Sequence, residues 1–189
     1  MNLGIFGGSF NPIHLGHLLL AETAREQLAL DRVVFIPASV PPHKGAKGLL
    51  PGAVRLKLVQ LATRDHPHFA VSDIELQRSG PSYTIDTVKL LKTQAPEAKL
   101  FLLIGEDMLT VKWASWAQLK RMCTIVAARR PTRTKARKES GVVWLEMPRV
   151  EISSSDIRAR ARAGRSLRYL VPPAVGRYIT QHHLYRSRS

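Results

Sequence analysis

The segment from Gly7 to His17 constrains the fold more than any other part of the chain. It follows a short apolar run, Leu3–Phe6, that predicts a strand, and it ends where an apolar helix is predicted to begin. A strand, a glycine turn and a helix N-terminus form a cradle for phosphate, because backbone N–H groups and the positive end of the helix dipole meet there. Glycine at positions 7, 8 and 16 leaves no side chain that would hold a ligand away from the backbone.

Two histidines, His14 and His17, lie inside this segment. Their spacing of i, i+3 predicts that the two rings share one face of the helix. Imidazoles beside a phosphate cradle favour nucleotide chemistry. A short glycine pattern alone is a weak signal, so a metal pair and surface histidines stay open as alternatives at this point.

Apolar strands alternate with helical segments along the chain, which predicts an α/β fold. We expect a Rossmann-like, doubly wound parallel sheet with its ligand at the carboxyl ends of the strands. No repeat or domain boundary is visible, so we expect a single domain over 1–189, with a small helical C-terminal part over 151–189. The predicted strands are Leu3–Phe6, Arg32–Ile36, Phe69–Ser72, Leu100–Ile104, Thr124–Ala128 and Val142–Leu145, and the predicted helical segments are Leu15–Leu28, Ala53–Thr63, Ile85–Leu91, Met108–Val111 and Trp116–Arg121.

The composition excludes several classes of protein. No apolar run is long enough to cross a membrane, and the first predicted strand leaves no room for a signal peptide. The single cysteine, Cys123, excludes an internal disulfide, and we expect a buried strand residue in a cytoplasmic protein. The sequence leaves the oligomeric state open, a homo-oligomer included.

The net charge of +15 is placed unevenly. From Lys120 onward there are 17 Lys and Arg residues against four Asp and Glu, and the basic stretch Arg129–Lys138 is predicted to be disordered. Such a field attracts polyanions, so a basic nucleic-acid-binding module is the alternative from another class. Charge is its only support, since no basic motif interleaved with aromatic residues accompanies it. We therefore expect no specific nucleic-acid partner.

The run Ser153-Ser154-Ser155-Asp156 predicts a helix start, because hydroxyl groups there accept hydrogen bonds from free backbone N–H groups. With Arg158 about one turn inside, Ser154 and Ser155 predict a second phosphate site. An ordinary N-cap with a surface arginine is the alternative. The arginines beyond the motif are expected to be surface charge; they are Arg160, Arg162, Arg165 and Arg168.

Together these motifs resemble those of the bacterial nicotinate-nucleotide adenylyltransferases. His-x-Gly-His points only to the wider nucleotidyltransferase superfamily, whereas the Pro-Pro-His-Lys and Ser-Tyr-Thr-x-Asp-Thr motifs narrow the resemblance to this family. The motifs follow the family's order: Gly7–His17, Pro41–Lys44, Ser82–Thr87, Gly105–Asp107 with Trp113, Arg130-Pro131, Ile152–Arg158 and Val171–Ile179.

The resemblance implies transfer of the adenylyl group of ATP to nicotinate mononucleotide, which gives deamido-NAD and pyrophosphate in NAD biosynthesis. The nucleophile would be a phosphate oxygen that is already ionised at neutral pH, so no general base is assigned. Catalysis would consist of holding two anions in line and neutralising charge as pyrophosphate leaves. The sequence shows no clustered carboxylates, so we expect no protein-held metal site and a Mg²⁺ carried mainly by the ATP phosphates.

The resemblance also implies residue roles. The histidine pair and Arg158 would be catalytic, through contact with the ATP phosphates. The ATP site would comprise Gly7, Gly8, Ser9, Phe10, His14, His17, Gly105, Asp107, Arg130, Ser154, Ser155 and Arg158, and the nicotinate-nucleotide site Asn11, Lys44, Tyr83, Thr84 and Trp113.

Two positions depart from the family's pattern. Ser155 stands where threonine is usual and keeps the hydroxyl, whereas Ala114 stands where another aromatic residue or a histidine often follows the tryptophan. The stacking of Trp113 on the pyridine ring is therefore less secure than the phosphate site. Within the superfamily, a pantetheine-phosphate adenylyltransferase or a cytidylyltransferase is the alternative, as is a preference for the amidated nucleotide.

Overall fold

Six strands form one sheet in a computed structural model, which describes residues 1–42, 48–128, 140–148 and 150–186. The strand order is β3-β2-β1-β4-β5-β6, and every neighbouring pair is parallel. The strands are β1 Asn2–Gly8, β2 Arg32–Pro37, β3 Phe69–Val71, β4 Lys99–Gly105, β5 Thr124–Ala128 and β6 Val142–Leu145.

The chain begins in the middle of the sheet. From β1 it winds outward to β2 and β3, and then crosses back to β4 on the other side of β1. This confirms the predicted doubly wound sheet, and the reversal of direction between β1 and β4 places a crevice at the carboxyl ends of these two strands.

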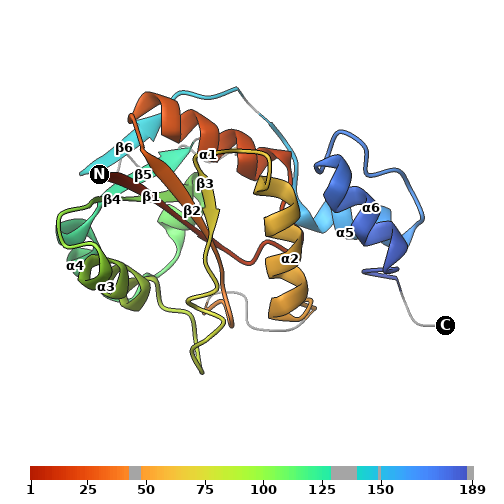
Figure 1. The fold of residues 1–189 in the computed structure, drawn as a ribbon, viewed down its shortest axis with the longest axis horizontal. Helices are drawn as coiled ribbons and strands as arrows, with labels where there is room; N and C mark the ends of the chain where they lie inside the picture. The colour runs from red at the N-terminus through yellow and green to blue at the C-terminus, as the bar shows by residue number, and fades with distance from the viewer. Residues whose placement is uncertain (43–47, 129–139, 149, 187–189) are drawn as a thin grey trace.

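Helices cover both faces of the sheet (Figure 1). The predicted helices are present, with ends that differ from the expectation by a few residues, and the segment predicted near Met108–Val111 is a 3₁₀-helix that begins two residues earlier. The helices are α1 Leu15–Gln27, α2 Gly52–Thr63, α3 Thr84–Gln94, η1 Glu106–Thr110, α4 Trp116–Met122, α5 Ser154–Arg162 and α6 Pro173–Gln181.

The alternation of side chains along the strands divides the core into two layers. In β4, Leu102 and Ile104 pack in a cluster with α3 and α4, whereas Leu103 between them packs in the cluster that includes α1 and α2. Both faces are apolar because both faces are covered by helices.

The C-terminal part of the chain packs in the cluster that includes α1 and α2. Ile157 of α5 and Val175 of α6 are fully buried in it together with Leu58 of α2. Figure 1 shows α5 and α6, in blue, beside α2. This packing brings the helix start at Ser153 to the same end of the sheet as the glycine turn after β1.

Candidate active site

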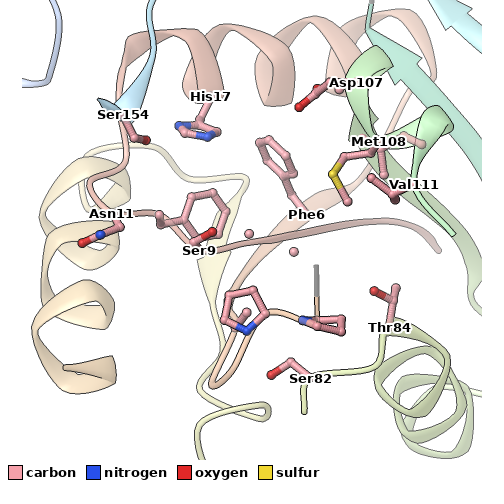
Figure 2. A pocket seen from close by; sticks show the side chains of 18 of the residues that line it. Phe6, Ser9, Asn11, His17, Ser82, Thr84, Asp107, Met108, Val111 and Ser154 are labelled. Carbon is pink, nitrogen blue, oxygen red and sulfur yellow. The ribbon is translucent and has the colours of Figure 1, made fainter. Parts of the chain in front are cut away.

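A cavity of about 1080 Å³ opens at the carboxyl ends of β1 and β4. In Figure 2, Ser154 and His17 lie on one side of it, Ser82 and Thr84 lie opposite, and Asp107 and Met108 lie on a third side. The cavity gathers the predicted site residues that the structure describes: Gly7, Gly8, Ser9, Phe10, Asn11, His14, His17, Tyr83, Thr84, Gly105, Asp107, Trp113, Ser154, Ser155 and Arg158.

Two predicted residues, Lys44 and Arg130, lie outside the described residues, as does the basic stretch 129–138. The neighbours of Lys44 in its motif, Pro41 and Pro42, line the cavity.

The glycine turn is built around Phe10. Its backbone adopts a φ of 43°, and its ring is buried, 5.6 Å from the Phe6 ring centroid in an edge-to-face arrangement. A Cβ at Gly8 would lie 3.0 Å from the Phe10 ring, so any side chain at this position would press on that buried ring. Phe10 is therefore first of all a packing residue that sets the shape of the turn.

The other two glycines differ from each other. A Cβ at Gly7 would meet no atom within 4 Å, and Gly7 lines the cavity, as expected of a position left open for a ligand. A Cβ at Gly16 would instead lie 3.1 Å from Nδ1 of His14. Our expectation that Gly16 clears space for a ligand was wrong, because its missing side chain makes room for the His14 ring.

The histidine pair lies at the start of α1. His14 has extended backbone angles and is the N-cap residue, so of the two only His17 lies within the helix. The rings nevertheless lie together as predicted, with centroids 3.7 Å apart. The backbone N–H of His14 donates to Nδ1 of His17 at 3.2 Å, which places the proton of a neutral His17 ring on Nε2.

Asn11 joins the turn to two distant segments. Its amide nitrogen donates to the Gly48 carbonyl at 3.0 Å, and its Oδ1 accepts from the Leu50 N–H at 3.2 Å and from the Tyr185 hydroxyl at 3.1 Å. Asn11 is only 3 % exposed. Although it was predicted to contact the nicotinate nucleotide, its side chain is thus engaged in holding the walls of the cavity together.

The start of α5 has its own N-cap residue and is hydrogen-bonded to the glycine turn after β1. Ser153 Oγ accepts from the Asp156 N–H at 3.1 Å, which confirms the predicted N-cap. Ser154 Oγ donates to the Pro12 carbonyl at 2.9 Å. Arg158 donates through Nη1 to the Asn11 carbonyl at 2.9 Å and through Nη2 to Ser155 Oγ at 3.1 Å.

Tyr185, close to the C-terminal end of the described chain, is a residue that the sequence analysis missed. It has a φ of 68°, and burial raises the pKa of its hydroxyl. The hydroxyl donates to Asn11 next to Arg158. The tail after α6 therefore takes part in fixing the glycine turn, and nothing in its local sequence signals this.

Arg55 of α2 is the second residue that was missed. It is 2 % exposed and donates to three backbone carbonyls: Nε to Leu50 at 2.9 Å, Nη1 to Ser9 at 2.9 Å and Nη2 to Ser39 at 3.3 Å. Burial lowers the pKa of its guanidinium. A signal existed, because Arg55 shares one helix face with Leu58 and Val59, where a charged residue is unexpected.

The opposite wall of the cavity is formed by the start of α3. The N–H of Ser39 donates to Ser82 Oγ at 2.8 Å, and the Ser82 N–H donates to the Val40 carbonyl at 2.9 Å. Tyr83 is the N-cap residue of α3, and its own N–H donates to the Pro81 carbonyl. The N-terminus of α3, beginning at Thr84, is directed at the cavity.

A buried carboxylate supports this wall. Thr87 Oγ1 donates to Glu75 Oε1 at 2.6 Å and accepts from Arg78 Nη2 at 2.7 Å. Glu75 is 5 % exposed and lines the cavity, which the sequence analysis did not anticipate.

Trp113 closes the third side. Its Nε1 donates to the Met108 carbonyl at 2.6 Å, and its ring lies 5.4 Å from that of Trp116. Trp113 and Ala114 line the cavity, whereas Trp116 packs in the adjacent hydrophobic cluster, as expected. Gly105 ends β4, and Asp107 follows it in η1.

Arg162 also lines the cavity, one turn beyond Arg158 on α5. It is exposed, as expected of surface charge, but it faces the site. Arg160, two residues before it, instead donates to the Ser166 carbonyl at 2.9 Å.

Three further observations bear on earlier expectations. Cys123 is buried, as expected, but the prediction of a strand residue was wrong, because it is the C-cap residue of α4 and β5 begins one residue later; burial raises the pKa of its thiol to about 11. No three His, Cys, Asp or Glu side chains gather as a metal centre in the described part of the chain. None of the helices described has the length and apolar composition needed to cross a membrane.

Known proteins resemble this chain over nearly its whole length. The family model described as "Cytidylyltransferase-like" matches residues 5–160. A "Probable nicotinate-nucleotide adenylyltransferase" from Thermus thermophilus is 45% identical, with 98% of this chain and 100% of the relative covered. A relative of the same description from Thermomicrobium roseum is 41% identical, with 98% and 92% covered.

Solved structures share the fold. Plasmodium falciparum nicotinic acid mononucleotide adenylyltransferase complexed with NaAD superimposes with a TM-score of 0.82 at 18% identity, with 97% of each chain covered. The same enzyme complexed with APC gives a TM-score of 0.80, with 97% and 96% covered.

Proposed function

The chain belongs to the cytidylyltransferase-like family and, within it, to the nicotinate-nucleotide adenylyltransferases, and we propose that it transfers the adenylyl group of ATP to nicotinate mononucleotide. The products would be deamido-NAD and pyrophosphate. One structural observation supports this most: the glycine turn with its histidine pair and the N-terminus of α3 face each other across one cavity. Two separate anion-binding helix N-termini on opposite walls suit two nucleotides better than one.

In the proposed reaction a phosphate oxygen of the mononucleotide attacks the α-phosphorus of ATP. A new P–O bond forms, the bond to the β-phosphate oxygen breaks, and pyrophosphate leaves with its electron pair. The nucleophile carries its negative charge already, so the protein has no proton to remove. Its task is to align the two phosphates and to stabilise the charge that moves to pyrophosphate.

The histidine pair is placed for this task. A neutral His17 would present Nε2–H to a phosphate oxygen, because its Nδ1 is occupied as an acceptor. The start of α1 adds the positive end of a helix dipole. We assign His14 and His17 to the ATP phosphates and no general base to either.

A second group of donors lies at the start of α5. Ser154, Ser155 and Arg158 already bond to the glycine turn or to each other, so they hold the two anion-binding segments in register. Arg158 uses two donors in these bonds, and a guanidinium has five. We propose that its remaining donors form hydrogen bonds with the pyrophosphate as it leaves and stabilise its negative charge.

Mg²⁺ would supply further charge neutralisation when bound with ATP. The donor set fits an ion carried mainly by phosphate oxygens and water, because the carboxylates that line the cavity, Asp107 and Glu75, come from separate walls. We therefore expect Mg²⁺ to enter with the nucleotide, with Asp107 as the carboxylate that lines the cavity after β4.

The nicotinate carboxylate is assigned to the N-terminus of α3. Because the Tyr83 N–H donates to Pro81, the donor for the carboxylate is expected to be the Thr84 N–H in the first turn. A carboxamide oxygen can accept this bond as well, but it lacks the negative charge that a helix N-terminus favours, which disfavours the amidated nucleotide. Trp113 would stack on the electron-poor pyridine ring.

A pyrophosphate-release assay tests the proposal. Purified protein is given ATP and Mg²⁺ with nicotinate mononucleotide, nicotinamide mononucleotide or phosphopantetheine. We expect turnover with the first substrate and much slower turnover with the second. Turnover with phosphopantetheine alone would overturn the assignment.

A further inference from the structure

Arg55 is a buried cation that forms no ion pair with any residue the structure describes. Its acceptors are three backbone carbonyls, those of Ser9, Ser39 and Leu50. Removing a guanidinium from water is costly unless strong hydrogen bonds replace the lost hydration. A simple core position would be filled more stably by an apolar residue, so the charge and its fork of donors call for a functional reason.

The three carbonyls belong to two loops at the carboxyl end of the sheet. Ser9 lies in the glycine turn after β1, whereas Ser39 and Leu50 lie near the two ends of the loop between β2 and α2. Arg55 thus joins the glycine turn to both ends of the β2–α2 loop through one side chain.

From each end of the β2–α2 loop, one further hydrogen bond leads to a wall of the cavity. The Ser39 N–H donates to Ser82 Oγ, next to the start of α3, and the Leu50 N–H donates to Asn11 Oδ1 in the glycine turn. Ser9 is itself part of the turn and lines the cavity. Arg55 therefore connects the wall assigned to ATP with the wall assigned to the nicotinate nucleotide.

We propose that Arg55 is a positioning residue that sets the spacing between the two nucleotide sites. The inference rests on the proposed function, because it is the in-line meeting of the two phosphates that needs this spacing. A misplacement of 1 Å in such a reaction costs roughly a hundredfold in rate, whereas each nucleotide can still bind to its own wall. The expected signature is a loss in kcat that exceeds the loss in affinity for either substrate.

Arginine suits this role better than lysine. Its planar fork carries five donors in fixed directions, so it can reach three carbonyls at once. A lysine keeps the charge but offers a compact ammonium on a flexible stem, and it cannot reproduce the three directions together. Arg55→Lys therefore separates the geometric role from the charge.

The test compares Arg55→Lys and Arg55→Met with Leu58→Ala, one turn along the same helix. Leu58 is fully buried and lies outside the cavity, so Leu58→Ala destabilises the fold without touching the hydrogen bonds of Arg55. Thermal unfolding of each variant fixes an assay temperature at which all are folded. Binding of ATP and of nicotinate mononucleotide, each alone, is measured by calorimetry, and kcat in the pyrophosphate-release assay.

We expect a tenfold to hundredfold loss of kcat in both Arg55 variants, with each Kd changed by less than about threefold. Leu58→Ala should keep a kcat near that of the wild type. An equal loss of kcat in Leu58→Ala, or a loss in the Arg55 variants that follows the Kd of one substrate, would overturn the inference.

Ser82→Ala is a second test that leaves the buried cation in place. It removes the acceptor of the Ser39 N–H, and we expect a smaller fall in kcat that is not additive with Arg55→Lys. Fully additive effects would contradict a shared connection, and this result stands even where Arg55→Met does not fold. A wild-type protein that shows no turnover with nicotinate mononucleotide would instead refute the proposed function.

Discussion

The two walls of the cavity are built in opposite ways. The wall assigned to ATP is held by side chains from distant parts of the chain, with Ser154, Arg158 and Tyr185 all bonded to the segment at Asn11 and Pro12. The wall assigned to the nicotinate nucleotide is held by hydrogen bonds between residues closer in sequence, those of Thr87 with Glu75 and Arg78, and by the bond from the Ser39 N–H to Ser82 Oγ. A triphosphate needs several donors in fixed relative positions, whereas a carboxylate can be recognised by one helix N-terminus.

This difference predicts different consequences for the two walls. Substitution of the histidine pair, which we assign to the ATP phosphates, should lower kcat, because it disturbs charge stabilisation that is needed most in the transition state. Substitution of the side chain assigned to the pyridine ring on the opposite wall should mainly raise the KM of one substrate.

The largest effect is expected for the histidine pair. His14→Ala or His17→Ala should lower kcat by about 10²- to 10³-fold, since each would remove a donor that we assign to the charge developing on the ATP phosphates. His68→Ala is the matched control, because His68 is exposed and lies outside the cavity. A folded His14→Ala variant with near-normal turnover would refute the catalytic role of the pair.

Trp113→Ala should act on the other wall. Loss of the stacking surface is expected to raise the KM for nicotinate mononucleotide about tenfold and to leave the KM for ATP nearly unchanged. Trp113→Phe keeps an aromatic ring but loses the bond from Nε1 to the Met108 carbonyl, so an intermediate KM is expected. Steady-state kinetics with each substrate varied in turn measures both values.

Trp144 of β6 supplies the control for the two Trp113 variants, since Trp144 lies outside the cavity. Trp144→Phe should leave both KM values unchanged. An equal rise of the two KM values in Trp113→Ala would contradict the assignment of one substrate to each wall.

Most of the fold follows from sequence pattern. The six apolar runs correspond to the six strands, because a strand buried on both faces must be apolar along its length. The site residues could be placed where a motif is local, as at Gly7–His17 and Ser153–Arg158. Ends of elements were less predictable, and the 3₁₀ turn at Glu106–Thr110 is an example.

The missed residues share a physical reason. Arg55 and Tyr185 reach the glycine turn through hydrogen bonds to residues far away in sequence, 46 residues in the bond from Arg55 to Ser9 and 174 in the bond from Tyr185 to Asn11. No local spacing records such contacts. For Gly16 the motif was evident from the sequence, but the reason for glycine was not. Only the packing shows that a side chain there would meet the ring of His14.

Tyr185→Phe measures how much the C-terminal tail contributes to the ATP wall. The variant loses one hydrogen bond, whereas Asn11 Oδ1 keeps the Leu50 N–H as a donor. We expect the free energy of unfolding to fall by about 1 kcal/mol, with a modest rise in the KM for ATP. Urea unfolding at constant m-value would measure the change, and an unaltered midpoint would show that the tail does not stabilise the turn.

The smallest effect is expected for Arg162, at the edge of the ATP wall. Arg162 and Arg160 lie on the same helix and carry the same charge, but only Arg162 lines the cavity, whereas Arg160 is bonded to the Ser166 carbonyl. Arg162→Ala should weaken ATP binding about threefold to fivefold and leave AMP binding unchanged, because of these two nucleotides only ATP has β- and γ-phosphates, which we expect to lie toward α5. Arg160→Ala removes the same charge from the same helix, so equal losses in the two variants would mean that the general field, and not the position of Arg162, attracts the nucleotide.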